Sequence, residues 1–200
     1  MARAVLHDGD MRIFCSALCL MAVAMVTGGV ARAETCPDVT DHSVGFARLV
    51  DMIRAAPDQR TARMISNEMW ALWTDAPDAR AQAMLDRGMA RRADLDLVGA
   101  QADFDALVAY CPDYGEGYNQ RAIIHFIRRD YDNALTDLDR ALALTPTHLG
   151  ALSGRAMTLI ALGREDQAQY DLRVAVDLNP WLPERGLLMD PVPDRDDPDL

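Results

Sequence analysis

The sequence contains no lysine, so all 20 of its basic side chains are arginines, and they are outnumbered by 31 aspartates and glutamates. The formal net charge at pH 7 is −11. Proteins that bind nucleic acids gain much of their affinity from basic side chains that neutralise phosphates. We therefore predict no nucleic-acid partner for this chain.

Motifs that carry catalysis are also missing. The sequence has no glycine-rich phosphate loop, no Cys and His spacing typical of a metal site, and no nucleophile elbow. His42, His125 and His148 are interpreted as core or surface residues. We predict that the protein is not an enzyme and that it has no cofactor and no metal site.

One long apolar run stands near the N-terminus. Arg12 precedes an apolar stretch over residues 13–26, and residues 31–33 read Ala-Arg-Ala, a small-x-small cleavage site. We interpret residues 1–33 as a secretory signal peptide that is cleaved before Glu34. The run is too short to span a bilayer comfortably, so a retained membrane anchor is the less favoured alternative. These features predict a periplasmic or secreted protein with no stable membrane span after cleavage.

Cysteine is scarce, with four residues in the chain. Cys15 and Cys19 would leave with the signal peptide, and Cys36 and Cys111 would remain. Two cysteines in an oxidising compartment are expected to form a disulfide. The alternatives are two free thiols or a bridge between two chains, because sequence alone does not show how close the Cα atoms come.

A constant period runs through the second half of the chain. Pro112, Pro146 and Pro180 are equally spaced, and each would end the helix before it. Small residues recur in register where two helices would approach closely, and larger residues recur where they would fill the gaps. The small residues are Gly88, Ala122 and Ala156, then Ala100, Ala134 and Ala168, and the larger ones are Phe104, Leu138 and Leu172.

This pattern and its spacing resemble the tetratricopeptide repeat, a helix-turn-helix unit of about 34 residues. The resemblance is strongest in the second and third units, since Arg91 and Leu107 replace the usual aromatic residue and alanine in the first. It implies an all-α fold, an α-solenoid of stacked antiparallel helix pairs. The resemblance covers residues 81–182 as three units, 81–114, 115–148 and 149–182.

Charged residues repeat with the same period. Arginines are expected on the first helix of each unit and aspartates on the second. Because the two helices are antiparallel, we predict a ladder of partly buried Arg–Asp contacts, bidentate where the geometry allows. The alternative is a solvated charge on each helix. The residues are Arg87, Arg121 and Arg155, with Asp103, Asp137 and Asp171.

The segments on either side of the repeats lack the signature. Residues 34–80 are expected to form a helix pair over 43–55 and 59–73, with a degenerate fourth repeat as one interpretation. Trp70 and Trp73 are expected to pack against the next helix. Residues 183–200 are expected to form a segment that caps the third unit and then a disordered acidic tail.

In the tetratricopeptide family the first helices line a concave face that binds other proteins, and the resemblance implies such a groove here. Apolar side chains beside amides would suit an extended peptide or an amphipathic helix. The alternative is that the N-terminal helices or the C-terminal segment cover this face. The groove positions are Met89, Arg92, Glu116, Asn119, Ile123, Phe126, Ser153, Met157 and Ile160.

The chain resembles small exported bacterial tetratricopeptide proteins. We predict a periplasmic scaffold or adaptor that binds a protein or peptide of the cell envelope through its concave helical face. The alternative is a structural subunit that self-associates, for example as a homodimer, or that stacks within a larger cell-envelope assembly. An accessible groove in a monomer would favour the first prediction, and a dimer that buries the concave face would favour the second.

Overall fold

The computed structural model divides the chain into two units, residues 1–33 and residues 34–200, and it describes residues 35–189. The predicted signal peptide lies outside the described residues. The acidic tail from residue 190 onward also lies outside them.

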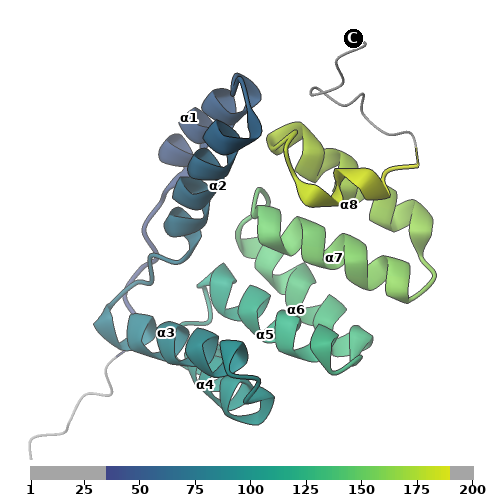
Figure 1. Ribbon diagram of the computed structural model, residues 1–200. Coiled ribbons are helices and arrows are strands. Elements are labelled where there is room, and N and C mark those ends of the chain that lie inside the picture. The colour runs from purple at the N-terminus through teal and green to yellow at the C-terminus, as the bar shows by residue number, and fades with distance from the viewer. Residues whose placement is uncertain (1–34, 190–200) are drawn as a thin grey trace, which may run out of the picture. The chain divides into compact units, whose positions relative to one another are not determined.

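Residues 35–189 form eight α-helices and one short 3-10 helix, with no strand among them. Three antiparallel pairs, α3 with α4, α5 with α6 and α7 with α8, stack in sequence order (Figure 1). The predicted all-α solenoid of stacked helix pairs is confirmed. The elements are α1 (Ser43–Arg54), α2 (Gln59–Trp73), α3 (Ala79–Ala93), α4 (Leu97–Tyr110), α5 (Gly115–Ile127), α6 (Tyr131–Leu144), α7 (Leu149–Ala161), α8 (Glu165–Leu178) and the 3-10 helix η1 (Pro183–Leu187).

Small residues let helices approach closely, both within a pair and between successive pairs. A Cβ atom added at Gly88 of α3 would lie 2.4 Å from Cε1 of Phe104 in α4. At Gly154 of α7 an added Cβ would lie 3.1 Å from Cδ2 of Leu138 in α6. Phe104 and Leu138 are buried, so a larger side chain at Gly88 would have to displace the core.

The turn between the two helices is repeated in each pair. Leu95, Arg129 and Gly163 occupy the same place in successive repeats and have φ angles of 63°, 62° and 71°. Residues with a Cβ rarely adopt this left-handed conformation, whereas glycine does so freely. In each turn the next residue donates its N–H to a carbonyl of the preceding helix at 2.8 to 2.9 Å, and this bond holds the chain in the turn.

The predicted Arg–Asp ladder is present. The guanidinium of Arg121 donates to both carboxylate oxygens of Asp137, at 2.8 and 2.7 Å, and Nε of Arg87 donates to Asp103 at 2.8 Å. Asp137 is 5% exposed and Asp103 is 6% exposed, so the arginines compensate carboxylates whose burial would otherwise be costly. The hydrogen bonds to Asp137 raise the pKa of Arg121 above its ordinary value.

A second bond from the same guanidinium joins successive pairs. Arg155 of α7 holds Asp171 of α8 with two bonds of 2.7 Å and also donates to Asp139 of α6 at 2.9 Å. Arg121 likewise reaches Asp105 of α4 at 2.9 Å. Each of these arginines therefore bridges one aspartate before it in the chain and another after it, and the bonds link three helices.

The expected N-terminal helix pair is present, but α1 and α2 are not a fourth unit of the stack. The position in α2 that corresponds to Asp105 and Asp139 is occupied by Ala71, so the bond that joins the other pairs cannot form there. The two helices run at a steep angle to α3–α8, along the N-terminal ends of α5 and α7 (Figure 1). Trp73 packs on Phe46 and His148 rather than against the next helix, and Trp70, also expected to pack against that helix, is 49% exposed.

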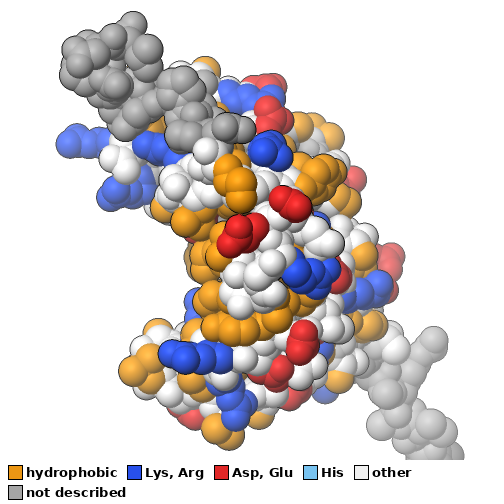
Figure 2. Space-filling view, turned by 90° about the vertical axis from the view of Figure 1, so that its right-hand side faces the viewer, with side chains coloured by type: hydrophobic (Ala, Val, Ile, Leu, Met, Phe, Trp, Pro, Cys, Tyr) orange, Lys and Arg blue, Asp and Glu red, His pale blue; other side chains and the backbone are white. Residues whose placement is uncertain are grey.

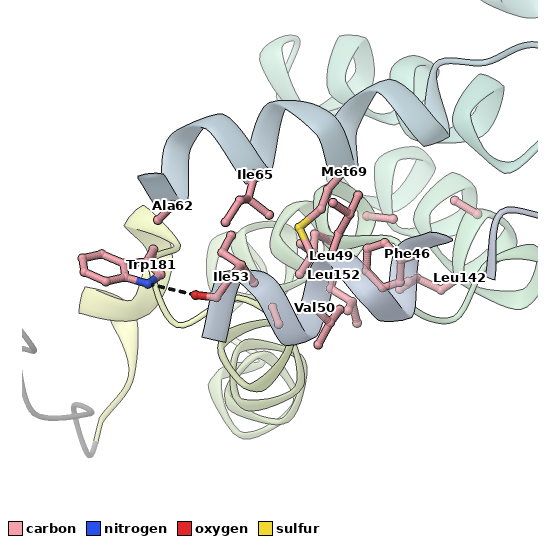
Figure 3. Packing of buried hydrophobic residues seen from close by; sticks show 14 of the residues in the cluster. Phe46, Leu49, Val50, Ile53, Ala62, Ile65, Met69, Leu142, Leu152 and Trp181 are labelled. Carbon is pink, nitrogen blue, oxygen red and sulfur yellow. Dashed lines mark hydrogen bonds between the residues drawn. The ribbon is translucent and has the colours of Figure 1, made fainter. Parts of the chain in front are cut away.

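The α1–α2 pair also reaches the C-terminal end of the stack. The indole Nε1 of Trp181 donates to the carbonyl of Ile53 at 3.2 Å, and Arg54 donates to the carbonyl and carboxylate of Asp177 at 2.8 and 2.7 Å. Figure 3 shows apolar side chains of α1 and α2 in one buried cluster with Leu152 and with others from the stack. The segment after Pro180 also packs on α8 of the third pair, where Nε2 of Gln169 donates to the carbonyl of Leu187 at 3.0 Å and Leu188 is buried beside Leu172.

Cys36 and Cys111 are joined by a disulfide, with their Cα atoms 5.1 Å apart. Cys111 directly follows α4, and Cys36 lies in the segment that leads into α1. The bond therefore tethers the start of the α1–α2 pair to the first repeat pair, at a place where stacking does not hold the two together.

We expect Arg155→Met to lower the free energy of unfolding by about 3 to 5 kcal/mol, because it leaves the buried carboxylate of Asp171 without its cation. Asp139→Asn is the matched control, since it removes only the exposed partner of the same arginine, and we expect no more than about 1 kcal/mol. Urea denaturation followed by circular dichroism measures both. Equal losses in the two variants would contradict this assignment.

We expect the double variant Cys36→Ser, Cys111→Ser to be less stable than the wild type by about 4 kcal/mol, because a sequence separation of 75 residues makes loop closure costly in entropy. Thermal unfolding with and without a thiol reductant provides the check. Reductant should lower the Tm of the wild type and leave that of the double variant unchanged. If complete reduction leaves the Tm of the wild type unchanged, the disulfide adds no stability.

Candidate functional site

The predicted groove residues lie on α3, α5 and α7, the first helices of the three pairs. Figure 2 shows a hollow lined by hydrophobic side chains, on the side of the unit that faces the viewer in Figure 1. Ile127, which the sequence analysis missed, is 45% exposed next to Phe126. The partly exposed groove residues are Met89, Arg92, Ile123, Phe126, Met157 and Ile160.

The other expected groove residues are buried. Glu116, Asn119 and Ser153 are 2%, 4% and 8% exposed. The expectation that they are open to a ligand is therefore not met in this structure. For Glu116 and Asn119 the reason is a hydrogen-bonded network at the start of α5, which uses their side chains internally.

Glu116 is the centre of this network. Its carboxylate accepts hydrogen bonds from Nδ2 of Asn119 at 2.9 Å, from Nε2 of Gln120 and from Nε2 of His148 at 2.7 Å. His148 caps α7 by accepting the N–H of Ala151 at Nδ1, so the proton of a neutral imidazole resides on Nε2 and points at Glu116. A carboxylate buried in this way needs several donors, and here it has three.

Arg92 extends the network toward the hollow. Its guanidinium donates to Oε1 of Gln120, and Nε2 of the same amide donates to Glu116. Burial lowers the pKa of Arg92, and the negative charge of Glu116 opposes that shift. Arg92 thus brings a half-buried cation to the edge of the apolar surface.

The α1–α2 pair covers the part of the face that contains the network. The ring of Trp73 stacks on His148 with centroids 4.6 Å apart, and the hydroxyl of Tyr114 donates to the carbonyl of Trp73 at 2.6 Å. The concave face is therefore divided. Its part near the N-terminal ends of α5 and α7 is occupied by the chain itself, and its part near their C-terminal ends is partly exposed.

Two buried polar atoms on this face have no hydrogen-bond partner. They are Oδ1 of Asn119 and Oγ of Ser153. The two residues occupy equivalent places in successive repeats, one on α5 and the other on α7. Buried polar atoms are rarely left unpaired, and such atoms are candidates for contact with a ligand.

The contacts of Gln120, His148 and Trp73 in this network were not predicted from the sequence. The signal for the Glu116–His148 pair is weak, because both residues lie at the start of a first helix but at different repeat positions. Over the described range 35–189, no group of three or more His, Cys, Asp or Glu side chains is placed to hold a metal ion. In that range no helix is long and apolar enough to cross a membrane.

Comparison with known proteins agrees with the repeat pattern. The family model of the tetratricopeptide repeat matches residues 115–148, which contain α5 and α6. A TPR repeat-containing protein of Rhizobium etli is 30% identical over 122 residues, which cover 59% of this chain and 58% of that protein. The match thus spans a little over half of the length of this relative.

Solved structures show the same fold. The first TPR of Spaghetti (RPAP3) bound to the HSP90 peptide SRMEEVD has a TM-score of 0.50 and 21% identity, covering 50% of this chain and 80% of that one. The second TPR domain of human RPAP3, in complex with the HSP70 peptide SGPTIEEVD, has a TM-score of 0.50 and 20% identity, covering 52% and 88%. The Arabidopsis OM64 TPR domain has a TM-score of 0.50 and 19% identity, covering 52% and 85%.

These likenesses agree with features of the chain itself. The constant period, the stacked antiparallel pairs and the repeated left-handed turn occur together in residues 81–182. Residues 115–148 match the model of the tetratricopeptide repeat family, and the described residues share the fold of solved tetratricopeptide repeat structures.

Proposed function

We propose that this protein is an exported scaffold that binds an extended segment of another protein on the open part of its concave face and catalyses no reaction. The observation that carries the proposal is the row of partly exposed apolar side chains on α5 and α7. Ile123, Phe126, Met157 and Ile160 form this row, which we call the open face.

The chemistry of the open face suits a peptide. Ile123 and Phe126 of α5 are three residues apart, as are Met157 and Ile160 of α7. Residues at this spacing lie on the same side of a helix. The ring of Phe126 is held edge-on against Tyr131, with centroids 5.4 Å apart. A positioned aromatic ring beside flexible methionine gives pockets for apolar side chains of a partner.

Polar groups at the border of the open face would add direction to the binding. Arg92 has the amide of Gln120 as its hydrogen-bond partner rather than a carboxylate, so it can contact an acidic group of a ligand. Two similar structures hold peptides that end in Glu-Glu-Val-Asp, which supports a peptide ligand for this face.

Export supports a partner in the cell envelope. The run over residues 13–26 and the Ala-Arg-Ala sequence at 31–33 are typical of a cleaved signal. A disulfide between Cys36 and Cys111 is stable outside the cytoplasm and would be reduced inside it. We infer that the mature protein is periplasmic or secreted and binds a protein or peptide there.

Self-association is the second candidate function, and an observation on α8 favours it. Tyr170 is 66% exposed on α8, the last helix of the stack. A second copy could cover this ring and give a homodimer or a longer assembly. Sedimentation of the wild type and of Tyr170→Asp separates this function from the first, because only a dimer through α8 would dissociate in the variant.

We expect the double variant Phe126→Arg, Met157→Arg to lose binding of the partner that the mature wild type binds. An apolar ligand on the open face would bury two unpaired arginine charges, which is unfavourable. The measurement is site-specific photo-crosslinking from position 123 in envelope extracts, followed by mass spectrometry. Val98→Arg is the matched control, since Val98 is 72% exposed on α4, away from the open face. The control should keep the crosslinked partner. If the double variant crosslinks the same protein at the wild-type level, the open face is not the binding site.

A further inference from the structure

We propose that a second pocket, between the α1–α2 pair and the starts of α5 and α7, binds an organic cation, namely an alkyl guanidinium or ammonium group. This site is separate from the open face, so the proposal does not depend on peptide binding there.

The pocket is a cavity of about 330 Å³. This volume suits a small molecule or one long side chain. Residues 39–43, which lead into α1, line one side of it, and residues 144–148, between α6 and α7, line another. Separate parts of the chain therefore converge on the cavity, and the tether from Cys36 to Cys111 holds one of them close by.

Aromatic rings form the inner wall. Phe46 and Trp73 lie with ring centroids 5.3 Å apart at an angle of 49°, and Trp73 also stacks on His148. The phenol of Tyr114 is fixed by its hydrogen bond to the Trp73 carbonyl. Because these rings are held in place by packing, they offer a preformed surface. Aromatic faces attract cations, and they also pack well against an alkyl chain.

The charged residues that line the cavity are acidic. Asp41, Asp75, Asp113 and Glu116 line it, and the described lining residues include no arginine. The backbone N–H of Ser43 donates to Asp41 at 2.8 Å and lowers the pKa of that carboxyl, so Asp41 is ionised at neutral pH.

The carboxylates also act on Tyr114 in the aromatic wall. Burial raises the pKa of Tyr114, and the charges of Glu116 and Asp75 raise it further. Two of the carboxylates have a basic side chain beside them. Nε2 of His42 lies 2.9 Å from Asp75, and the guanidinium of Arg140, at the rim of the cavity, lies 3.3 Å from Asp113. A permanent cation inside the cavity would meet carboxylates at the mouth and aromatic rings within.

The same features favour an organic cation over a metal ion. A divalent metal needs several oxygen or nitrogen ligands that converge on one point. Among residues 35–189 no such group of three or more His, Cys, Asp or Glu exists. Scattered carboxylates around an aromatic wall instead match a delocalised guanidinium or an alkylammonium on an apolar stem.

The test is isothermal titration of the mature protein with two cations, free agmatine and the pentapeptide Gly-Gly-Arg-Gly-Gly with both termini capped, so that the arginine side chain is its only charge. A second peptide with citrulline in place of arginine is the matched neutral ligand, because it keeps the shape of the side chain and loses its charge. We expect saturable binding of at least one cation and at least about tenfold weaker binding of the citrulline peptide, corresponding to about 1.4 kcal/mol. Preference for agmatine would indicate a free small molecule, and equal or better binding of the peptide would indicate a side chain of a protein.

Variants at the mouth of the cavity assign the binding to this pocket without disturbing the core. Asp41→Asn and Asp75→Asn remove exposed carboxylates and should together weaken the bound cation about tenfold, whereas Asp132→Asn, an exposed acid on α6, should leave it unchanged. Thr147→Arg would place a cation in the cavity and should therefore weaken the binding of both added cations. Circular dichroism checks that each variant is folded. Absence of saturable binding by both cations, or equal affinity in the Asp41, Asp75 double variant and the wild type, would overturn the proposal.

Discussion

The buried aspartates of the second helices constrain the rest of the stack. A carboxylate such as that of Asp171, which is 1% exposed, is stable in the core only with a cation beside it. Arg155 supplies that cation through two bonds, and a third bond goes to Asp139 of the preceding pair. Because one guanidinium serves both contacts, the distance within a pair and the distance between pairs are set together.

Where that link ends, the architecture changes. The residue that would continue the ladder before Arg87 is Ala71, and the α1–α2 pair leaves the stack. It packs along the starts of α5 and α7 and reaches Trp181 beyond α8, so residues far apart in the chain share one apolar cluster. The protein thereby covers part of its own concave face and creates the acidic aromatic pocket beside it.

The covered part and the open part of this face differ in chemistry. Around Glu116 the polar groups are bonded to one another, and the helix pair shields them from water. Toward the C-terminal ends of α5 and α7 the side chains are apolar and partly exposed. Buried networks of this kind order a structure, while exposed apolar surface is where association gains free energy. The division explains why only part of the expected groove is a candidate for binding.

The amino-acid sequence by itself determined the helix pairs, their period and the Arg–Asp ladder, because these depend on spacing within a single repeat and on contacts at a constant offset along the chain. It also determined which helices carry the concave face. The tertiary structure alone decided where α1 and α2 pack, that Glu116, Asn119 and Ser153 are buried, and that Trp73 meets His148. These outcomes depend on apolar packing between segments that lie far apart in the chain, and no local period specifies such long-range contacts.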